Sequence, residues 1–344
     1  MSIAPLGIAL IGAGRIGQLH ARNMVRNPRA RLLCVFEQDE ERAKAVAEMA
    51  GCQVASEFEE AIDFPGVEAV YVCSPTDTHV DFVLRSVEAG KYVFCEKPVD
   101  LDLARASSCV RRLGGRVNRV MMGFNRRFDP SQQALREAVL AGEIGTIEQI
   151  LIISRDPAPP SRLYVSQSGG IFRDMTIHDF DTARSFAGFE FSSVFAYGSV
   201  LFSEEVRSFS DYDSVTVHLI GPRGETCTVI NSRHCPYGFE QRIEIFGSGG
   251  QVALENPRPI QLSTFTSNGE TRSRLYDFFP ERYASAYERL LEDFVLKARA
   301  CQPFSVTIAD GLRSLVLAEA AQRSAQTGSL ISIQEVSIGV ATVP

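Results

Sequence analysis

A chain of 344 residues is longer than one hydrophobic core usually supports, so two domains are expected. Its hydrophobic content of 45% and charged content of 22% are typical of a globular protein, and its net charge of −7 gives no general attraction for nucleic acid or an anionic membrane. The sequence has no apolar run long enough for a transmembrane helix and no secretory signal pattern at its start.

The first elements are a strand, a glycine-rich turn, a helix and a second strand. Residues 8–11 and 31–36 are apolar runs, and residues 18–25 have a helical pattern. Such glycines let the backbone approach a pyrophosphate, which the helix N-terminus attracts, and an acid after the second strand binds a ribose. The alternative is a glycine turn with a structural role only. The predicted dinucleotide-binding residues are Gly12, Ala13, Gly14, Arg15, Ile16, Gly17 and Glu37.

Strand and helix patterns continue to alternate up to residue 124, which predicts an α/β domain with a doubly wound parallel sheet. The further helices are expected at residues 40–50, 79–89 and 100–112, and the further strands at 69–73, 91–95 and 117–124. We therefore place a dinucleotide-binding domain at residues 1–124.

Near residue 145 the pattern changes to short strands separated by Gly, Pro and Asn turns, which is typical of an antiparallel sheet. The predicted strands are 146–153, 192–202, 214–220, 225–231, 242–246 and 251–254, and the predicted helices are 175–187, 281–300 and 308–327. This predicts a second, α+β domain at residues 125–344. Its C-terminal helix and tail, about residues 305–344, are expected to pack back on the first domain.

Two polar segments follow predicted parallel strands, whose carboxyl ends are where open α/β sheets bind ligands. The first, Ser74-Pro75-Thr76-Asp77-Thr78-His79, offers small polar groups to a cofactor. It could equally be a turn in which Thr76, Asp77 or Thr78 caps a helix, and a structural role is favoured for His79. The second is Glu96-Lys97-Pro98. Pro98 restricts the backbone of Lys97 and permits a cis peptide bond, and the Lys97 ammonium can polarise an alcohol or carbonyl oxygen.

A third polar segment, residues 168–181, contains Asp174 and His178. On a helix these two residues are neighbours, and Asp181 continues the same face. The alternative is a helix capped by Asp174, in which His178 has no catalytic role. If a nicotinamide takes a hydride from an alcohol carbon, His178 assisted by Asp174 can take the hydroxyl proton while Lys97 polarises the oxygen.

The eight cysteines include no CxxC pair, and several lie in apolar runs where cysteine acts as a small hydrophobic residue. Reduced thiols and a cytoplasmic location are expected. Cys227, His234 and Cys235 match no zinc spacing, so no metal is expected.

Several long strings carry a resemblance to a known family. They are residues 12–17, 96–98, 123–129, 154–160, 168–181 and 237–242. With them the chain resembles the glucose–fructose oxidoreductase and inositol dehydrogenase superfamily over its whole length, and most closely its inositol 2-dehydrogenases.

The resemblance implies an NAD-binding Rossmann domain and a C-terminal domain whose large open sheet builds the substrate site and a tetramer interface. It implies that Lys97, Asp174 and His178 are catalytic, with His178 as proton acceptor. The remaining residues predicted to bind the cofactor, from the two strand-end segments, are Ser74, Pro75, Thr76, Thr78, His79, Glu96 and Lys97. Those that the resemblance assigns to a polyol pocket, besides Asp174 and His178, are Asn125, Arg127, Asp156 and Tyr237.

The implied activity is NAD-dependent oxidation of an inositol ring hydroxyl, with myo-inositol giving 2-keto-inositol, in inositol catabolism by a cytoplasmic homotetramer. Glu37 stands where aspartate is commoner in the family; it keeps the charge that disfavours a 2′-phosphate, so NAD is expected over NADP. The segment around Asn125 varies with substrate among members, so an aldose or deoxysugar dehydrogenase remains an alternative. A nucleotide-binding sensor without catalysis is a more remote one.

Overall fold

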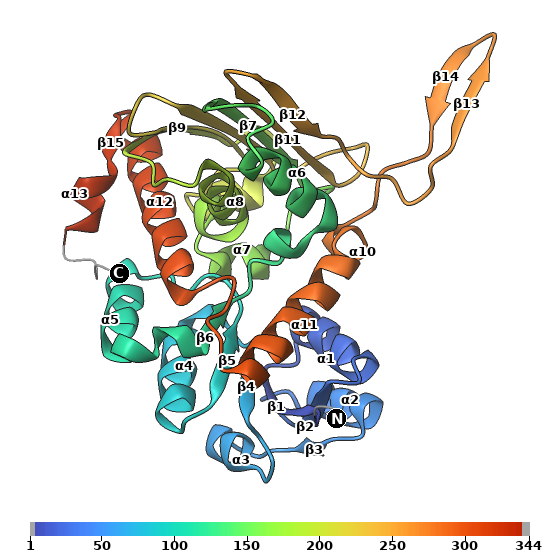
Figure 1. Cartoon of the computed structure of the whole chain (residues 1–344), viewed down its shortest axis with the longest axis vertical. Coiled ribbons are helices and arrows are strands. Elements are labelled where there is room, and N and C mark those ends of the chain that lie inside the picture. The colour runs from blue at the N-terminus through green and yellow to red at the C-terminus, as the bar shows by residue number, and fades with distance from the viewer. Residues whose placement is uncertain (1–3, 339–344) are drawn as a thin grey trace. The chain divides into compact units, whose positions relative to one another are not determined.

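The computed structural model describes residues 4–338, and its contacts divide the chain into two compact units (Figure 1). One unit comprises the chain up to Phe128 together with Ser285–Leu315, and the other comprises Asp129–Ala284 together with Val316–Ile338. The functional division at residue 124 stays a prediction. Residues 339–344 of the predicted C-terminal segment lie outside the described part of the chain.

The first unit is built on a six-stranded parallel sheet with the order β3-β2-β1-β4-β5-β6. Its strands are β1 (Leu6–Ile11), β2 (Ala30–Phe36), β3 (Gln53–Val54), β4 (Ala69–Val72), β5 (Tyr92–Cys95) and β6 (Val120–Met122). Every residue of β1 and β4 is buried, as expected for central parallel strands. The chain adds strands first on one side of β1 and then on the other, so the predicted doubly wound fold is confirmed.

Helices connect these strands. They are α1 (Arg15–Arg26), α2 (Glu40–Ala50), α3 (Phe58–Asp63), α4 (His79–Glu88) and α5 (Leu103–Leu113), with the short 3₁₀ helices η1 (Thr76–Thr78), η2 (Gly114–Arg119) and η3 (Asn125–Phe128). Because η2 takes up residues expected to be extended, β6 is shorter than predicted. Nearly all of α11 (Ala284–Ala300) also belongs to this unit, and the Met122 N–H donates to the Val306 carbonyl at 3.1 Å.

The second unit is built on a seven-stranded sheet with the order β12-β11-β7-β10-β9-β8-β15. Its strands are β7 (Ile147–Arg155), β8 (Ser193–Ser199), β9 (Ser214–Ile220), β10 (Thr226–Ser232), β11 (Glu240–Gly247), β12 (Gly250–Leu254) and β15 (Ile331–Ser332). Strands β7 and β10 pair in parallel, and the other neighbours pair antiparallel, which confirms the predicted mostly antiparallel sheet.

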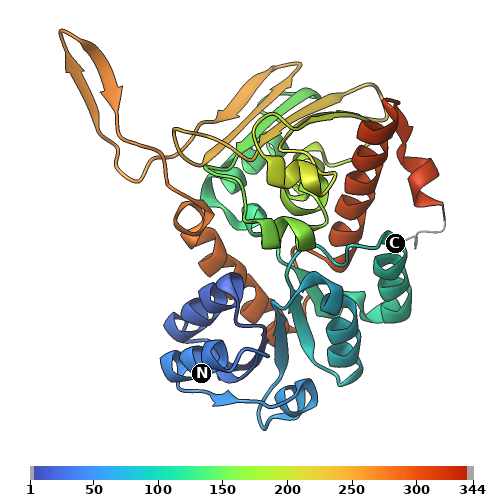
Figure 2. The ribbon, with the colours of Figure 1, turned by 180° about the vertical axis from the view of Figure 1, so that it is seen from behind.

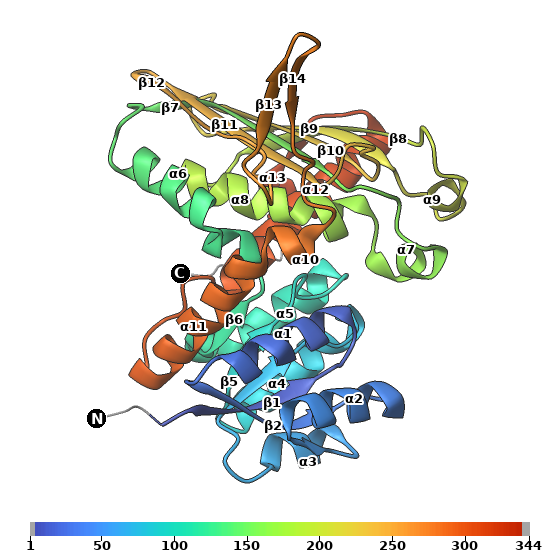
Figure 3. The same cartoon turned by 90° about the vertical axis from the view of Figure 1, so that its right-hand side faces the viewer.

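Helices α6 (Pro130–Leu140) and α8 (Ile177–Ala187) pack against one face of this sheet (Figure 3). Side chains of the opposite face, among them Phe195, Tyr197 and Phe246, are exposed. The remaining helices are α7 (Arg162–Ser168), η4 (Phe172–Thr176), α9 (Glu204–Ser208), α10 (Phe279–Arg282), α13 (Ile333–Ser337) and α12 (Ile308–Thr327), which begins in the first unit and ends in the second.

A hairpin of β13 (Ser263–Thr266) and β14 (Gly269–Arg272) projects away from the seven-stranded sheet (Figure 2). All residues of both strands are exposed, and neither segment shows in its sequence the alternation of apolar and polar residues that predicts a half-buried strand. Across residues 4–338, no helix combines the length and the apolar character needed to span a membrane.

Candidate active site

The predicted glycine turn joins β1 to α1 and depends on two close backbone approaches. Gly12 has a φ of +94°, and a Cβ there would lie 2.6 Å from the Ser74 nitrogen. A Cβ on Gly17 would lie 2.1 Å from the Gly12 carbonyl oxygen, whereas one on Gly14 would meet no heavy atom within 4 Å. No side chain caps the start of α1 at Gly14. Open space beside a helix N-terminus without a side-chain cap fits the pyrophosphate of a dinucleotide.

Glu37 lies beside this turn, directly after β2. Its Oε2 accepts a hydrogen bond from the Ala13 N–H at 2.6 Å, and its Oε1 accepts one from the Asp39 N–H at 3.1 Å. Because each carboxylate oxygen can accept two hydrogen bonds, both keep capacity for a ribose hydroxyl. The predicted ribose-binding acid is therefore next to the predicted pyrophosphate cradle.

The segment after β4 is fixed by its own polar groups. Ser74 Oγ lies 2.6 Å from Thr78 Oγ1, which donates to the Pro75 carbonyl at 2.7 Å. His79 is buried, with Nδ1 2.8 Å from the Pro98 carbonyl oxygen and Nε2 3.0 Å from that of Ser74. His79 thus links two of the predicted cofactor segments. Its burial lowers its pKa, although the two carbonyls oppose that shift.

The Glu96-Lys97-Pro98 segment follows β5, and the Lys97–Pro98 peptide bond is cis. Lys97 is half-buried, and Glu96 is buried. Glu96 Oε1 lies 2.8 Å from Nε2 of His20, a residue of α1 that the sequence reasoning did not single out. A Cβ on Gly123 would lie 2.8 Å from Glu96 Oε2, so this carboxylate is held on both sides.

Two predicted polyol-pocket residues lie just beyond β6. Asn125 is buried in η3, and Arg127 Nη2 is 3.2 Å from Asp310 Oδ1 of the first turn of α12. Their proposed contact with a substrate stays a prediction.

The prediction that Asp174 and His178 lie on one regular α-helix is wrong. Asp174 lies in a π-helical turn, Phe172–Thr176, which precedes α8. Such turns occur often at functional sites. Asp174 Oδ1 accepts a hydrogen bond from Tyr164 Oη at 2.7 Å, and its Oδ2 lies 3.2 Å from Arg233 Nη1. His178 is half-buried in the first turn of α8. Lys97 belongs to the first unit, and Asp174 and His178 to the second, so their action on one substrate remains a prediction.

Asp179 and Asp181, within the same segment, have structural partners. Asp179 is fully buried and accepts hydrogen bonds from Ser154 Oγ at 2.6 Å and Asn231 Nδ2 at 2.8 Å, which ties α8 to β7 and β10. Asp181 is also buried, 3.8 Å from Arg184 Nη1.

Tyr237 and Asp156, the other predicted pocket residues, follow strands of the second unit. Tyr237 Oη donates to the buried Glu240, which Arg155 also contacts. Tyr237 is exposed, but partial desolvation and the bond to Glu240 raise its pKa to about 12. Asp156 is half-buried just after β7, and its N–H donates to the Ser232 carbonyl at 2.9 Å.

Comparisons with known proteins agree with this architecture. Residues 6–124 match the oxidoreductase family with the NAD-binding Rossmann fold, and residues 132–253 match the GFO/IDH/MocA C-terminal domain. The chain is 44% identical over 326 residues to an inositol 2-dehydrogenase of Rhizobium meliloti, covering 94% of this chain and 98% of the relative. It is 40% identical over 330 residues to a myo-inositol 2-dehydrogenase of Thermotoga maritima, covering 96% and 99%.

A crystal structure of a myo-inositol dehydrogenase from Corynebacterium glutamicum superposes with a TM-score of 0.92 at 44% identity, covering 95% of this chain and 98% of that one. Sequence identity and fold agree over nearly the whole length, and the two family matches together cover most of residues 6–253. The chain is thus an oxidoreductase of the GFO/IDH/MocA family, and its cofactor is NAD.

Proposed function

We propose that this protein oxidises a ring hydroxyl of an inositol to a ketone, converting myo-inositol to 2-keto-inositol. The observation that carries the proposal is the high identity to proteins named inositol 2-dehydrogenases. Lys97, Asp174 and His178 lie in the sequence segments that resemble the family's motifs, which supports the proposal. NAD, when bound, supplies the acceptor for the hydride that leaves the carbinol carbon.

The protein's own groups handle the oxygen and its proton. The Lys97 ammonium hydrogen-bonds to the substrate hydroxyl and stabilises the negative charge that develops on its oxygen. The His178 imidazole takes the hydroxyl proton, and Asp174 stabilises the imidazolium that results. In this proposal Asn125, Arg127, Asp156 and Tyr237 orient the other hydroxyls of the ring.

The remaining roles follow the same proposal. Residues 1–124 hold NAD through the glycine turn, Glu37 and residues 74–79 and 96–97, and residues 125–344 build the substrate site. The exposed Phe195, Tyr197 and Phe246 on the open face of the seven-stranded sheet support an interface in a homotetramer, because large exposed apolar groups favour association. The absence of disulfides among the eight cysteines supports a reducing, cytoplasmic setting for inositol catabolism.

The direct test is NADH formation by the purified protein with a panel of inositols, aldoses and deoxysugars. We expect turnover with myo-inositol, and a loss of at least about 10²-fold in kcat for Lys97→Met and for His178→Ala. The binding constant for NAD, measured separately, should change little in His178→Ala. Turnover only with aldoses or deoxysugars would replace inositol as the substrate, and NAD binding with no turnover on any compound would favour a sensor.

A further inference from the structure

The second unit buries an arginine between two carboxylates. The Arg233 side chain is 1% exposed and follows β10 directly. Its Nη1 is 3.2 Å from Asp174 Oδ2, and its Nη2 is 3.7 Å from Asp211 Oδ2. A fully buried arginine is rare without such partners. One guanidinium therefore neutralises part of the charge of Asp174 and Asp211 together.

The other oxygen of Asp174 is held as well. Tyr164 Oη, from α7, donates to Asp174 Oδ1 at 2.7 Å. Tyr164 is 48% exposed, so the negative charge of Asp174 is the main reason that its pKa lies well above the usual value; the phenol stays protonated and remains a donor. Each oxygen of the Asp174 carboxylate thus accepts a hydrogen bond from another part of the chain: Oδ1 from Tyr164 of α7, and Oδ2 from Arg233 after β10.

Asp211 connects this arginine to the start of the π-helical turn. Its Oδ1 accepts a hydrogen bond from the Ile171 N–H at 2.9 Å, and a Cβ on Gly170 would lie 2.9 Å from the same oxygen. The approach is possible only because residue 170 is glycine, whose φ is +87°. Asp211 therefore holds the backbone that leads into Asp174.

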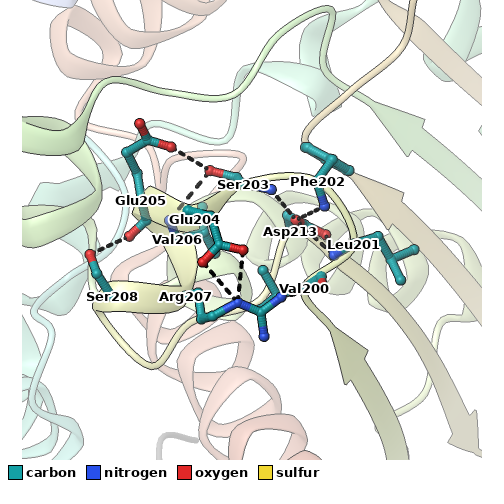
Figure 4. A network of polar contacts seen from close by, with 10 residues as sticks. All are labelled: Val200, Leu201, Phe202, Ser203, Glu204, Glu205, Val206, Arg207, Ser208 and Asp213. Atoms are coloured by element: carbon teal, nitrogen blue, oxygen red, sulfur yellow. Dashed lines mark hydrogen bonds and ion pairs between the residues drawn. The ribbon is translucent and has the colours of Figure 1, made fainter.

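The segment that carries Asp211 is fixed in turn by Asp213. The fully buried Asp213 carboxylate accepts hydrogen bonds at 3.0 Å from the N–H groups of Leu201, Phe202 and Ser203 (Figure 4). The Arg233 N–H donates to the Asp213 carbonyl at 2.8 Å. Hydrogen bonds thus connect the segment between β8 and β9 to Arg233, the residue that contacts Asp174.

We infer that Arg233 and Tyr164 are positioning residues that keep Asp174 ionised and fixed in direction, so that it can stabilise a protonated His178. The inference rests on the proposed catalytic role of Asp174. Without Arg233, the half-buried Asp174 and the buried Asp211 lose the positive charge that lies between them, which favours protonation of one of the two carboxylates. Asp211 and, after β7, Asp156 then add negative charge near the Asp174–Tyr164 pair. A neutral Asp174 cannot stabilise imidazolium.

The kinetic test compares Tyr164→Phe, Arg233→Lys and Arg233→Met with Arg207→Met, which removes an exposed arginine from the segment shown in Figure 4. We expect kcat to fall about tenfold or more in Arg233→Met, with the acidic limb of the kcat/KM profile at least about one pH unit higher. Arg233→Lys should recover part of both effects. Tyr164→Phe should show the same shift in weaker form, and Arg207→Met should match the wild type.

A second measurement does not depend on activity. Urea unfolding of Asp174→Asn, Arg233→Met and the double variant forms a cycle. Asp174→Asn should lower the unfolding midpoint in the wild-type background and leave it unchanged or raise it in Arg233→Met. Equal shifts in both backgrounds, or a Tyr164→Phe variant with wild-type kcat and pH profile, would overturn the inference. If the wild type oxidises no polyol, the proposed function fails, and the unfolding cycle still decides whether Arg233 stabilises the charged side chain of Asp174.

Discussion

His20 Nε2 lies 2.8 Å from Glu96 Oε1, so the helix after the glycine turn is bonded to the residue before Lys97. Both side chains are buried, and the His20 ring makes edge contacts with Tyr71, Phe94 and Tyr287. A buried carboxylate needs a donor, and this one has the histidine N–H. Through this pair the element that would hold the pyrophosphate also orients the strand end that presents Lys97.

Replacing His20 with phenylalanine should therefore be costly, although a planar aromatic ring remains at this position. The variant leaves the Glu96 carboxylate without its donor, and we expect the free energy of unfolding to fall by about 3 kcal/mol. The matched control is the same substitution in a Glu96→Gln background, where no buried charge is left and the loss should be clearly smaller. Urea unfolding of the four proteins measures both losses, and equal losses would contradict the role given to the pair.

Two glycines of the turn, Gly17 and Gly14, should have different roles, the first in stability and the second in NAD binding. Gly17→Ala should destabilise the protein by about 3 kcal/mol, because its Cβ would overlap the Gly12 carbonyl oxygen. Gly14→Ala has room for its Cβ and should change stability by no more than about 0.5 kcal/mol. It should nevertheless weaken NAD binding at least about tenfold, since the added methyl group occupies the space assigned to the pyrophosphate. Calorimetric titration with NAD, beside unfolding curves, tests both statements; unimpaired NAD binding by Gly14→Ala would remove Gly14 from the cradle.

Glu37 should set the preference for NAD over NADP. Its negative charge, bonded to the Ala13 N–H, repels a 2′-phosphate. Glu37→Gln keeps an oxygen that can accept this hydrogen bond but loses the charge, so we expect the ratio of kcat/KM for NADP to that for NAD to rise at least about tenfold. Glu37→Ser loses both and should shift the ratio in the same direction. A ratio unchanged in both variants would show that another group selects the cofactor.

Burial of His79 should make stability depend on pH. Burial lowers the pKa of His79 in the folded state below about 6.5. As the pH falls, His79 therefore binds a proton in the unfolded chain before it does so in the folded chain. The stability that His79 contributes is thus present above about pH 6.5 and is lost as the pH falls toward the folded-state pKa. His79→Gln should flatten the rise in unfolding free energy between about pH 5 and pH 7. Identical slopes for the two proteins would show that His79 is protonated alike in both states.

The sequence predicted best what depends on neighbouring residues. The strand, glycine turn, helix, strand and Glu37 follow each other within one short stretch, and the structure has them in that order. The antiparallel strands of the second unit were also predicted, because short segments rich in Val, Ile, Thr and Phe follow each other and turns separate them.

The features that sequence reasoning missed depend on contacts between distant residues. His20 meets Glu96 76 positions away, and Asp174 meets Arg233 59 positions away, so no local pattern marks either pair. The π-helical turn at Phe172–Thr176 has the same residue types as an α-helix and differs only in its hydrogen bonds. Arginine is usually exposed, so the burial of Arg233 could not be expected from its type.

In the proposed function, Lys97 and His178 act on the same hydroxyl of one bound polyol. A crystal structure of the protein with NAD and myo-inositol tests it most directly. We predict one inositol oxygen within hydrogen-bond distance, about 3 Å, of both the Lys97 ammonium and the His178 imidazole. A bound inositol whose hydroxyls each contact at most one of these two side chains would contradict the account.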